Sequence, residues 1–232
     1  QIIKALQKNT NVNQDKMFHV EWAYVTLLDR KEGCSPITLE NRLASDPSFF
    51  CELIQLIYRA KGAEPEAGIS EQRRNIASNA YRLLSTWSIV PGSQMDEVFN
   101  PDAFTIWLNS MEDIVKNSGH YDVAMIQLGD VLVNSPKGSD GLWIHPVIAE
   151  AMNSRNRSSL REGYSTGIRN SRGVHVVDPE AKPERALAEK YRKQAEEVEN
   201  FGYQRLATTL RDVAASYDYD AERIISRDGK LH

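Results

Sequence analysis

The sequence predicts an all-α fold, an irregular multi-helix array or bundle of about nine or ten helices that ends in an antiparallel helical hairpin. Apolar residues recur at helical spacing along most of the chain, and Ser, Asp or Asn followed by proline repeatedly marks helix starts. Strand-like character is confined to residues 174–177, which also suit an extended loop.

The composition is that of an ordinary globular protein. A chain of 232 residues suits one large domain or two small ones, and 41% hydrophobic residues allow a sizeable core. The net charge is −4, with acidic and basic residues mixed along the chain. This balance disfavours a chain that binds nucleic acid or a membrane surface as a whole, because both require an excess of positive charge.

The sequence features that report on cellular location predict a cytoplasmic protein. Cys34 and Cys51 are the only cysteines, so a disulfide framework is absent. No apolar run is long enough to span a bilayer, and no signal-peptide pattern opens the chain. The sequence begins at Gln1, without Met and inside a helical pattern, so we expect a portion of a larger protein.

The N-terminal elements are marked by caps and by one strongly apolar run. Residues 16–29 have two apolar faces, which predicts a helix with neighbours on both sides. Ser35-Pro36 and Asp46-Pro47 each predict an N-cap followed by proline in the first helical turn. The run 49–57 is expected to be the most buried helix, with Cys51 as an inert thiol.

The next elements suggest a division of the chain into two subdomains. A helix is expected at about 70–87, and the loop 89–100 follows it with Pro91-Gly92. We therefore predict an N-terminal helical subdomain over 1–90 and a C-terminal helical subdomain over 91–232.

The C-terminal subdomain contains further helix starts and a terminal hairpin. Caps are predicted at Asn100-Pro101 and Asp178-Pro179, and Pro146 opens another helix. Two apolar stripes over 180–226 are separated by Phe201-Gly202, which predicts an antiparallel helical hairpin.

The familiar catalytic and cofactor motifs are not found. Five histidines are scattered without metal-ligand spacing, and phosphate-loop, dinucleotide and kinase motifs are missing. The stretch 163–167 superficially resembles a nucleophile elbow around Ser165, but its context is helical. The sequence therefore predicts no catalytic residue, no cofactor and no metal site. An enzyme with an unfamiliar helical site stays open, and it would gather Glu21, Asp130 or His145 in a deep pocket.

One arginine-rich segment, residues 155–172, stands out as a candidate site. It contains five arginines and a single acid, Glu162. Arginine's planar guanidinium binds phosphate or carboxylate in bidentate fashion, so the segment suits a phosphate group, an RNA backbone or an acidic partner. Alternatively, its arginines pair with acids of the terminal hairpin and hold it to the body. The candidate binding residues are Arg155, Arg157, Arg161, Arg169, Asn170 and Arg172.

Three stretches carry a resemblance to a protein group: Tyr81–Trp87 leading to Pro91-Gly92, Gly141–Pro146, and Gly163-Tyr164 through Asn170–Gly173. They resemble a helical C-terminal region of large, poorly characterised bacterial multidomain proteins, some of which look like defence or signalling systems. The resemblance covers about residues 16–220. It implies a part of a larger bacterial protein and adds no active site.

These observations together predict a non-catalytic helical module that recognises or scaffolds a protein partner or other domains of the same polypeptide, without membrane contact. The alternative is binding of nucleic acid or nucleotide phosphate through Arg155–Arg172, which would weaken steeply with salt.

Overall fold

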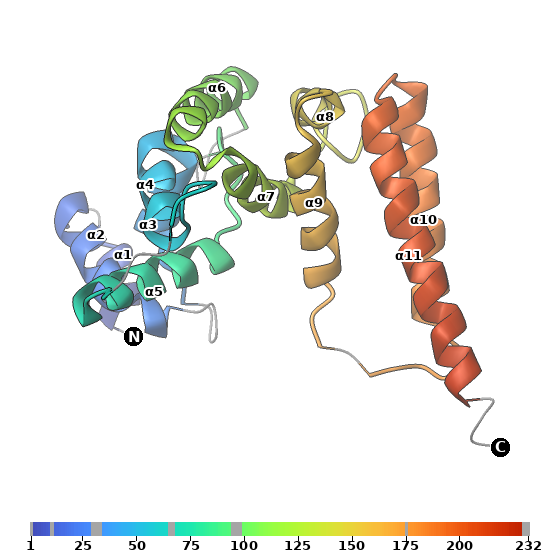
Figure 1. Cartoon of the computed structure of the whole chain (residues 1–232), viewed down its shortest axis with the longest axis horizontal. Helices are drawn as coiled ribbons and strands as arrows, with labels where there is room; N and C mark the ends of the chain where they lie inside the picture. The colour runs from blue at the N-terminus through green and yellow to red at the C-terminus, as the bar shows by residue number, and fades with distance from the viewer. Residues whose placement is uncertain are drawn as a thin grey trace. The chain divides into compact units, whose positions relative to one another are not determined.

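The computed structural model describes residues 2–9, 12–28, 34–64, 68–93, 99–174 and 176–228. All regular structure in these ranges is helical, with eleven α-helices and no strand, which confirms the all-α prediction (Figure 1). Val174, Val176 and Val177 belong to an exposed loop, whereas His175 lies outside the described residues. No helix within the described ranges is both long and apolar enough to cross a membrane.

The chain forms two compact units, 1–124 and 125–232, which divide within α7 (Tyr121–Val131). The boundary that we expected at 90/91 instead falls inside the first unit. Gly92 explains this, because its amide N donates to the carbonyl of Ala44 at 3.4 Å and its carbonyl accepts from the amide N of Asn100 at 2.9 Å. The Pro91-Gly92 turn is therefore tied to the helix that contains Ala44 and to the N-cap of the helix that begins at Pro101.

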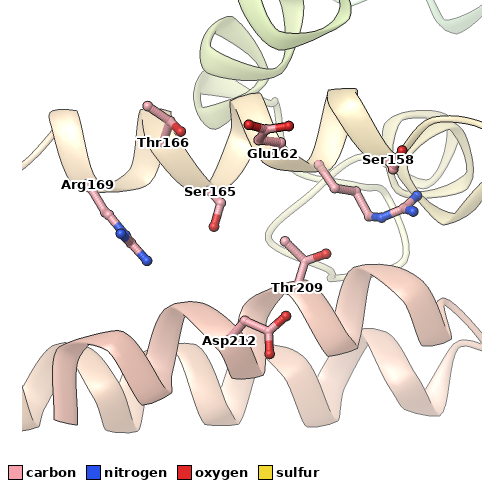
Figure 2. Close-up of a pocket in the computed structure, with 8 residues that line it drawn as sticks. Ser158, Glu162, Ser165, Thr166, Arg169, Thr209 and Asp212 are labelled. Carbon is pink, nitrogen blue, oxygen red and sulfur yellow. The ribbon is translucent and has the colours of Figure 1, made fainter. Parts of the chain in front are cut away.

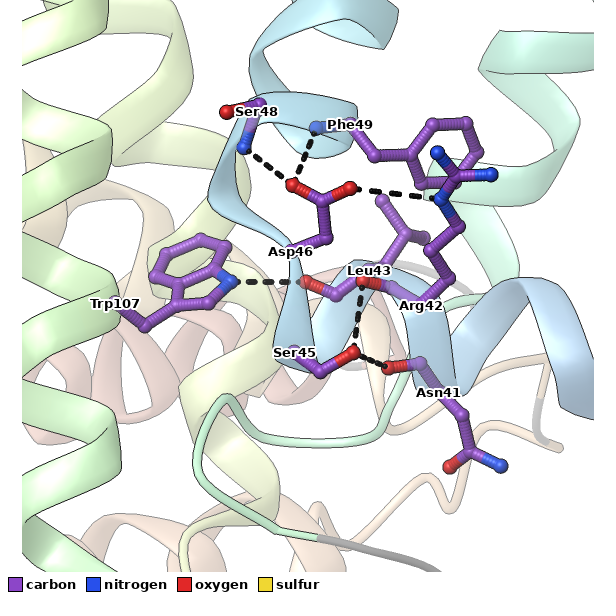
Figure 3. Close-up of polar contacts among 8 residues, drawn as sticks. All are labelled: Asn41, Arg42, Leu43, Ser45, Asp46, Ser48, Phe49 and Trp107. Atoms are coloured by element: carbon purple, nitrogen blue, oxygen red, sulfur yellow. Dashed lines mark hydrogen bonds and ion pairs between the residues drawn. The ribbon is translucent and has the colours of Figure 1, made fainter.

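Large aromatic side chains form the centre of the first unit. Phe50 lies with its ring centroid 5.5 Å from that of Trp87 and 5.3 Å from that of Trp107. All three side chains are buried, and the Trp107 indole Nε1 donates to the carbonyl of Leu43 at 3.0 Å (Figure 3). The helices of this unit are α1 (Ile2–Gln7), α2 (Gln14–Ala23), α3 (Ile37–Ser45), α4 (Pro47–Ile57), α5 (Glu71–Thr86) and α6 (Pro101–Ser118), with a 3-10 turn, η1 (Val25–Leu27).

Two of the four predicted Xaa-Pro caps are confirmed. Asp46 begins α4, where its Oδ1 accepts from the amides of Ser48 and Phe49 at 3.0 and 3.2 Å (Figure 3). Asn100 caps α6 in the same way, accepting from the amides of Asp102 and Ala103. In both cases a short polar side chain satisfies amides that have no partner within the helix.

The other two predicted caps are wrong. The N-cap of α3 is Pro36 and not Ser35, and the side chain of Pro36 makes no capping hydrogen bond. The prediction at Asp178 fails because its Oδ1 accepts only from the amide of Glu180, at 3.1 Å, in a turn. The following helix, α10, begins later, after Ala181, which has a left-handed backbone with φ of 53°.

The second unit contains the predicted helical hairpin. Its helices are α10 (Lys182–Asn200) and α11 (Gln204–Asp228), and Gly202 in the turn between them has φ of 88°. The Tyr191 and Tyr217 rings stack across the hairpin with centroids 5.8 Å apart. The unit also contains most of α7, η3 (Leu132–Asn134), α8 (Pro146–Asn153) and α9 (Ser158–Asn170).

Helices α7 and α9 cross at very short range because glycines lie at the contact. A Cβ added at Gly163 would lie 1.9 Å from the carbonyl oxygen of Ile126, and one added at Gly129 would lie 2.1 Å from that of Leu160. Both distances are far below van der Waals contact. The Gly163–Gly167 stretch that resembles a nucleophile elbow is therefore a helix-packing element, and it fixes the position of α9.

Candidate functional site

The six candidate residues of the arginine-rich segment do not converge on one site. The segment comprises the turn after α8, all of α9 and the turn that follows α9. Arg161 and Arg169 line a groove between α9 and α11, whereas the other four candidates do not line it. The individual environments of these residues decide which of them are available to a ligand.

Arg161 holds the C-terminal end of α8. Its Nη1 donates to the carbonyls of Met152 and Ser154 at 2.6 and 2.7 Å. Burial, and secondly the nearby positive charge of Arg205, lower the pKa of Arg161 below its usual value. This arginine caps a helix with one nitrogen and lines the groove with the rest of its side chain.

Arg172 and Asn170 connect α9 to its neighbours. Arg172 Nη2 forms an ion pair with Glu184 Oε1 of α10, and the two side chains are only 18% and 2% exposed. The Arg172 guanidinium also lies 6.0 Å from the ring centroid of Tyr217. Asn170 bonds the carboxyl group of Asp130, whose pKa is raised by burial and partly lowered again by this hydrogen bond. For Arg172, pairing with an acid of the terminal hairpin is therefore confirmed.

The first two arginines of the segment lie before α9. Arg155 is exposed in the turn between α8 and α9. Arg157 is the N-cap residue of α9, and its side chain makes no capping hydrogen bond.

The groove itself is open, and the residues that line it are all charged or hydroxyl-bearing. It has a volume of about 370 Å³. Figure 2 shows Ser165 and Arg169 pointing from α9 toward α11, and Thr209 pointing back toward α9, with Asp212 near Thr209 on α11. The lining residues are Ser158, Arg161, Glu162, Ser165, Thr166, Arg169, Thr209 and Asp212.

Arg169 and Asp212 differ from the charged residues around them. Neither forms an ion pair or a hydrogen bond through its side chain in the described part of the chain, although both line one groove. Elsewhere on the hairpin, Arg192 pairs with Asp218 and Arg211 with Glu199. The groove therefore presents a cation and an anion that are both available to a ligand.

The contribution of α11 to this groove was missed from the sequence. Thr209 and Asp212 lie more than 35 residues beyond the arginine-rich segment, and Asp212 is one of many acids in a mixed-charge helix. The available signal is register, because both residues border the buried stripe that contains Leu210 and Val213. That signal places them beside a packing surface and does not identify which helix lies there.

The acids and the histidine of the enzyme hypothesis have structural contacts. Glu21 is fully buried, and its two oxygens accept from Gln7 Nε2 at 2.7 Å and from the Leu39 amide at 3.0 Å. It therefore supplies the N-terminal hydrogen bond of α3 that Ser35 was expected to make. His145 is the N-cap of α8, and its Nδ1 accepts from the amide of Val147 at 3.3 Å. Burial lowers the pKa of His145.

Two further observations concern cysteine and the metal-ligating side chains. Cys51 is buried, as predicted, and burial raises the pKa of its thiol to about 12. Among the described residues, no group of three or more His, Cys, Asp or Glu side chains is placed to hold a metal ion.

Comparisons with protein-family models, with curated proteins and with solved structures gave no match. The assignment of a function therefore depends on the geometry of the α9–α11 groove.

Proposed function

We propose that this chain is a non-catalytic helical module of a larger bacterial protein and that it recognises a protein segment through the α9–α11 groove. The proposal depends on the polar lining, where Arg169 and Asp212 have no ion-pair partner among the described residues. Such a lining offers donors and acceptors to a peptide backbone and to charged side chains. The resemblance described above supports the setting in a larger protein, with a role in defence or signalling.

The lining favours a protein segment over a small organic ligand. Pockets for small molecules are mostly lined by hydrophobic and aromatic side chains and enclose most of the ligand. The α9–α11 groove is open and has no such side chain among its lining residues. A ligand there would keep much of its surface in water, as a docked polypeptide segment does.

The charges of the groove also favour protein over nucleic acid. Two arginines are accompanied by two acids, Glu162 and Asp212, which would repel a phosphate backbone. In addition, Arg172 of the arginine-rich segment is already paired with Glu184. Phosphate binding is therefore the competing outcome of the test, and it would appear as binding that weakens steeply with salt.

Site-specific photo-crosslinking tests the proposal directly. A benzoylphenylalanine at Thr166, an exposed residue of the groove, should give covalent protein adducts in lysate of the source cells. The matched control places the same group at Lys193, an exposed α10 residue that does not line the groove. Identical adducts from both positions would contradict the proposal, and adducts that disappear after nuclease treatment would support the phosphate alternative.

Charge reversal provides the second arm of this experiment. Arg169→Glu and Asp212→Arg change exposed side chains that form no ion pair within the part of the chain that the structure describes, so stability should stay within about 0.5 kcal/mol of the parent. Each should strongly reduce the Thr166 adduct, because each removes one of the available charges. An undiminished adduct in both variants would show that these charges do not bind the partner.

A further inference from the structure

The relative direction of α9 and α11 fixes the order of charges along the groove. Near the start of α9, Arg161 is close enough to Arg205 of α11 for the two positive charges to interact. Beyond the end of α9, the guanidinium of Arg172 lies over the ring of Tyr217. The two helices therefore run side by side in the same direction.

Asp212 lies on α11 between Arg205 and Tyr217, the two residues that mark the ends of its contact with α9. The groove consequently presents a positive charge at Arg161, negative charge in the middle at Asp212, and a positive charge at Arg169. Figure 2 shows Asp212 and Arg169 along the groove. Arg161 uses Nη1 to bond α8, which leaves its Nε and Nη2 donors for a ligand. Glu162 adds a second acid on the α9 side.

The spacing of these charges matches an extended chain. Arg161 and Arg169 are eight residues apart in one helix, which corresponds to about 12 Å along its axis. An extended segment rises about 3.3 Å per residue, so about four residues cover that distance. Residues at positions 1, 3 and 5 of such a segment all project to the same face.

The groove between α9 and α11 is open to solvent along its length and has a volume of about 370 Å³. An extended chain can insert the side chains of one face into such a groove while its other face stays in water.

We propose that the groove binds an extended segment with an acid, a base and an acid at alternate positions. The outer acids pair with Arg161 and Arg169, and the central base pairs with Asp212 and Glu162. This inference rests on the proposed function, because it specifies the protein segment that the groove recognises.

An NMR titration of the full chain with short capped peptides tests this pattern. The probe is acetyl-Glu-Gly-Lys-Gly-Glu-amide, and the control is the permuted acetyl-Glu-Glu-Gly-Gly-Lys-amide of the same composition. Amide signals of Ser165, Arg169 and Asp212 should shift with a dissociation constant of roughly millimolar magnitude. The permuted peptide should bind at least about threefold more weakly, because its charges cannot meet all three positions.

Reciprocal charge reversal identifies the individual pairs. Arg169→Glu should weaken binding of the probe by about threefold to tenfold, and a peptide with Lys in place of its last Glu should restore it. Asp212→Arg should be compensated by Glu at the centre of the peptide. Equal binding of the permuted peptide, no shifts at all, or failure of both compensations would overturn the inference. If Thr166 still yields specific protein adducts in that case, the proposed function stands and only the charge pattern is wrong.

Discussion

The two units of this chain bury their helices by different means. In the first unit, large rings fill the space between helices, with Phe50 packed against Trp87 and Trp107. In the second unit, small residues let helices approach closely, as at Gly129 and Gly163. Alanines continue this pattern between α10 and α11, where Ala188, Ala195, Ala207, Ala214 and Ala221 are all buried.

This difference determines how each unit responds to mutation. A core of large side chains is damaged mainly by removal of volume, because a cavity remains. A contact of small residues is damaged mainly by addition of volume, because backbone atoms cannot move aside. The close approach at α9 also leaves the opposite face of that helix available for the groove.

The largest expected effect is removal of a ring from the first unit. Phe50→Ala should destabilise the protein by about 3–5 kcal/mol, measured by chemical denaturation, because the fully buried ring leaves a cavity. Phe50→Leu keeps most of the volume and should cost clearly less. A loss below about 1 kcal/mol for the alanine variant would contradict a core held by aromatic volume.

Gly163→Ala tests the opposite principle in the second unit. The added methyl would lie 1.9 Å from the Ile126 carbonyl oxygen, so we expect a loss of about 2–3 kcal/mol. This outweighs the gain of at most about 1 kcal/mol from the helix propensity of alanine. The control is Thr166→Ala on the exposed side of the same helix, with little change. A stabilised Gly163→Ala variant would refute the close crossing.

Arg172→Ala tests whether the ion-paired arginine of the arginine-rich segment contributes more to stability than an exposed arginine does. The substitution removes the ion-pair partner of the buried Glu184 carboxylate, and we expect about 2 kcal/mol of destabilisation. This is below the range for fully buried pairs, since Arg172 is partly exposed. Arg155→Ala, in an exposed turn, should stay within about 0.5 kcal/mol in the same thermal unfolding measurement. Equal losses in the two variants would mean that the ion pair does not hold the hairpin.

Glu21→Gln probes a polar contact within the first unit. The substitution keeps the shape of the side chain but replaces one acceptor oxygen with a donor, so one of the two buried hydrogen bonds is lost. We expect a cost of about 1 kcal/mol, equivalent to a fall in Tm of about 2–4 °C. Glu52→Gln, at an exposed position of α4, is the control and should leave Tm unchanged.

The smallest expected effect is a pH dependence at His145. Because burial lowers its pKa in the folded state, the unfolded chain binds the proton more readily. The contribution of neutral His145 to folding stability is therefore fully present when the pH is above the ordinary histidine pKa of 6.5. This contribution is lost as the pH falls below that value. His145→Asn retains a capping side chain but does not titrate. The fall in Tm between about pH 7.5 and pH 5.5 should therefore be smaller in this variant than in the parent. An unchanged fall would show that other groups cause it.

The sequence alone determined the features that depend on neighbouring residues. Helical periodicity, the caps at Asp46 and Asn100, and the turn at Gly202 each depend on contacts within a few positions. All of these were predicted correctly, as were the terminal hairpin and the buried thiol of Cys51. Local hydrogen bonds and apolar spacing leave a clear signal because the chain itself holds those residues together.

Only the tertiary structure decided the features whose partners are distant in the chain. Glu21 supplies the hydrogen bond expected of Ser35, and Gly163 meets a carbonyl from another helix. Similarly, Arg172 forms an ion pair with Glu184, whereas Arg169 lines the same open groove as Asp212. Identical residue types thus differ in role, because the partner of a charge and the space beside a glycine depend on which helices pack together. Sequence spacing does not specify that packing.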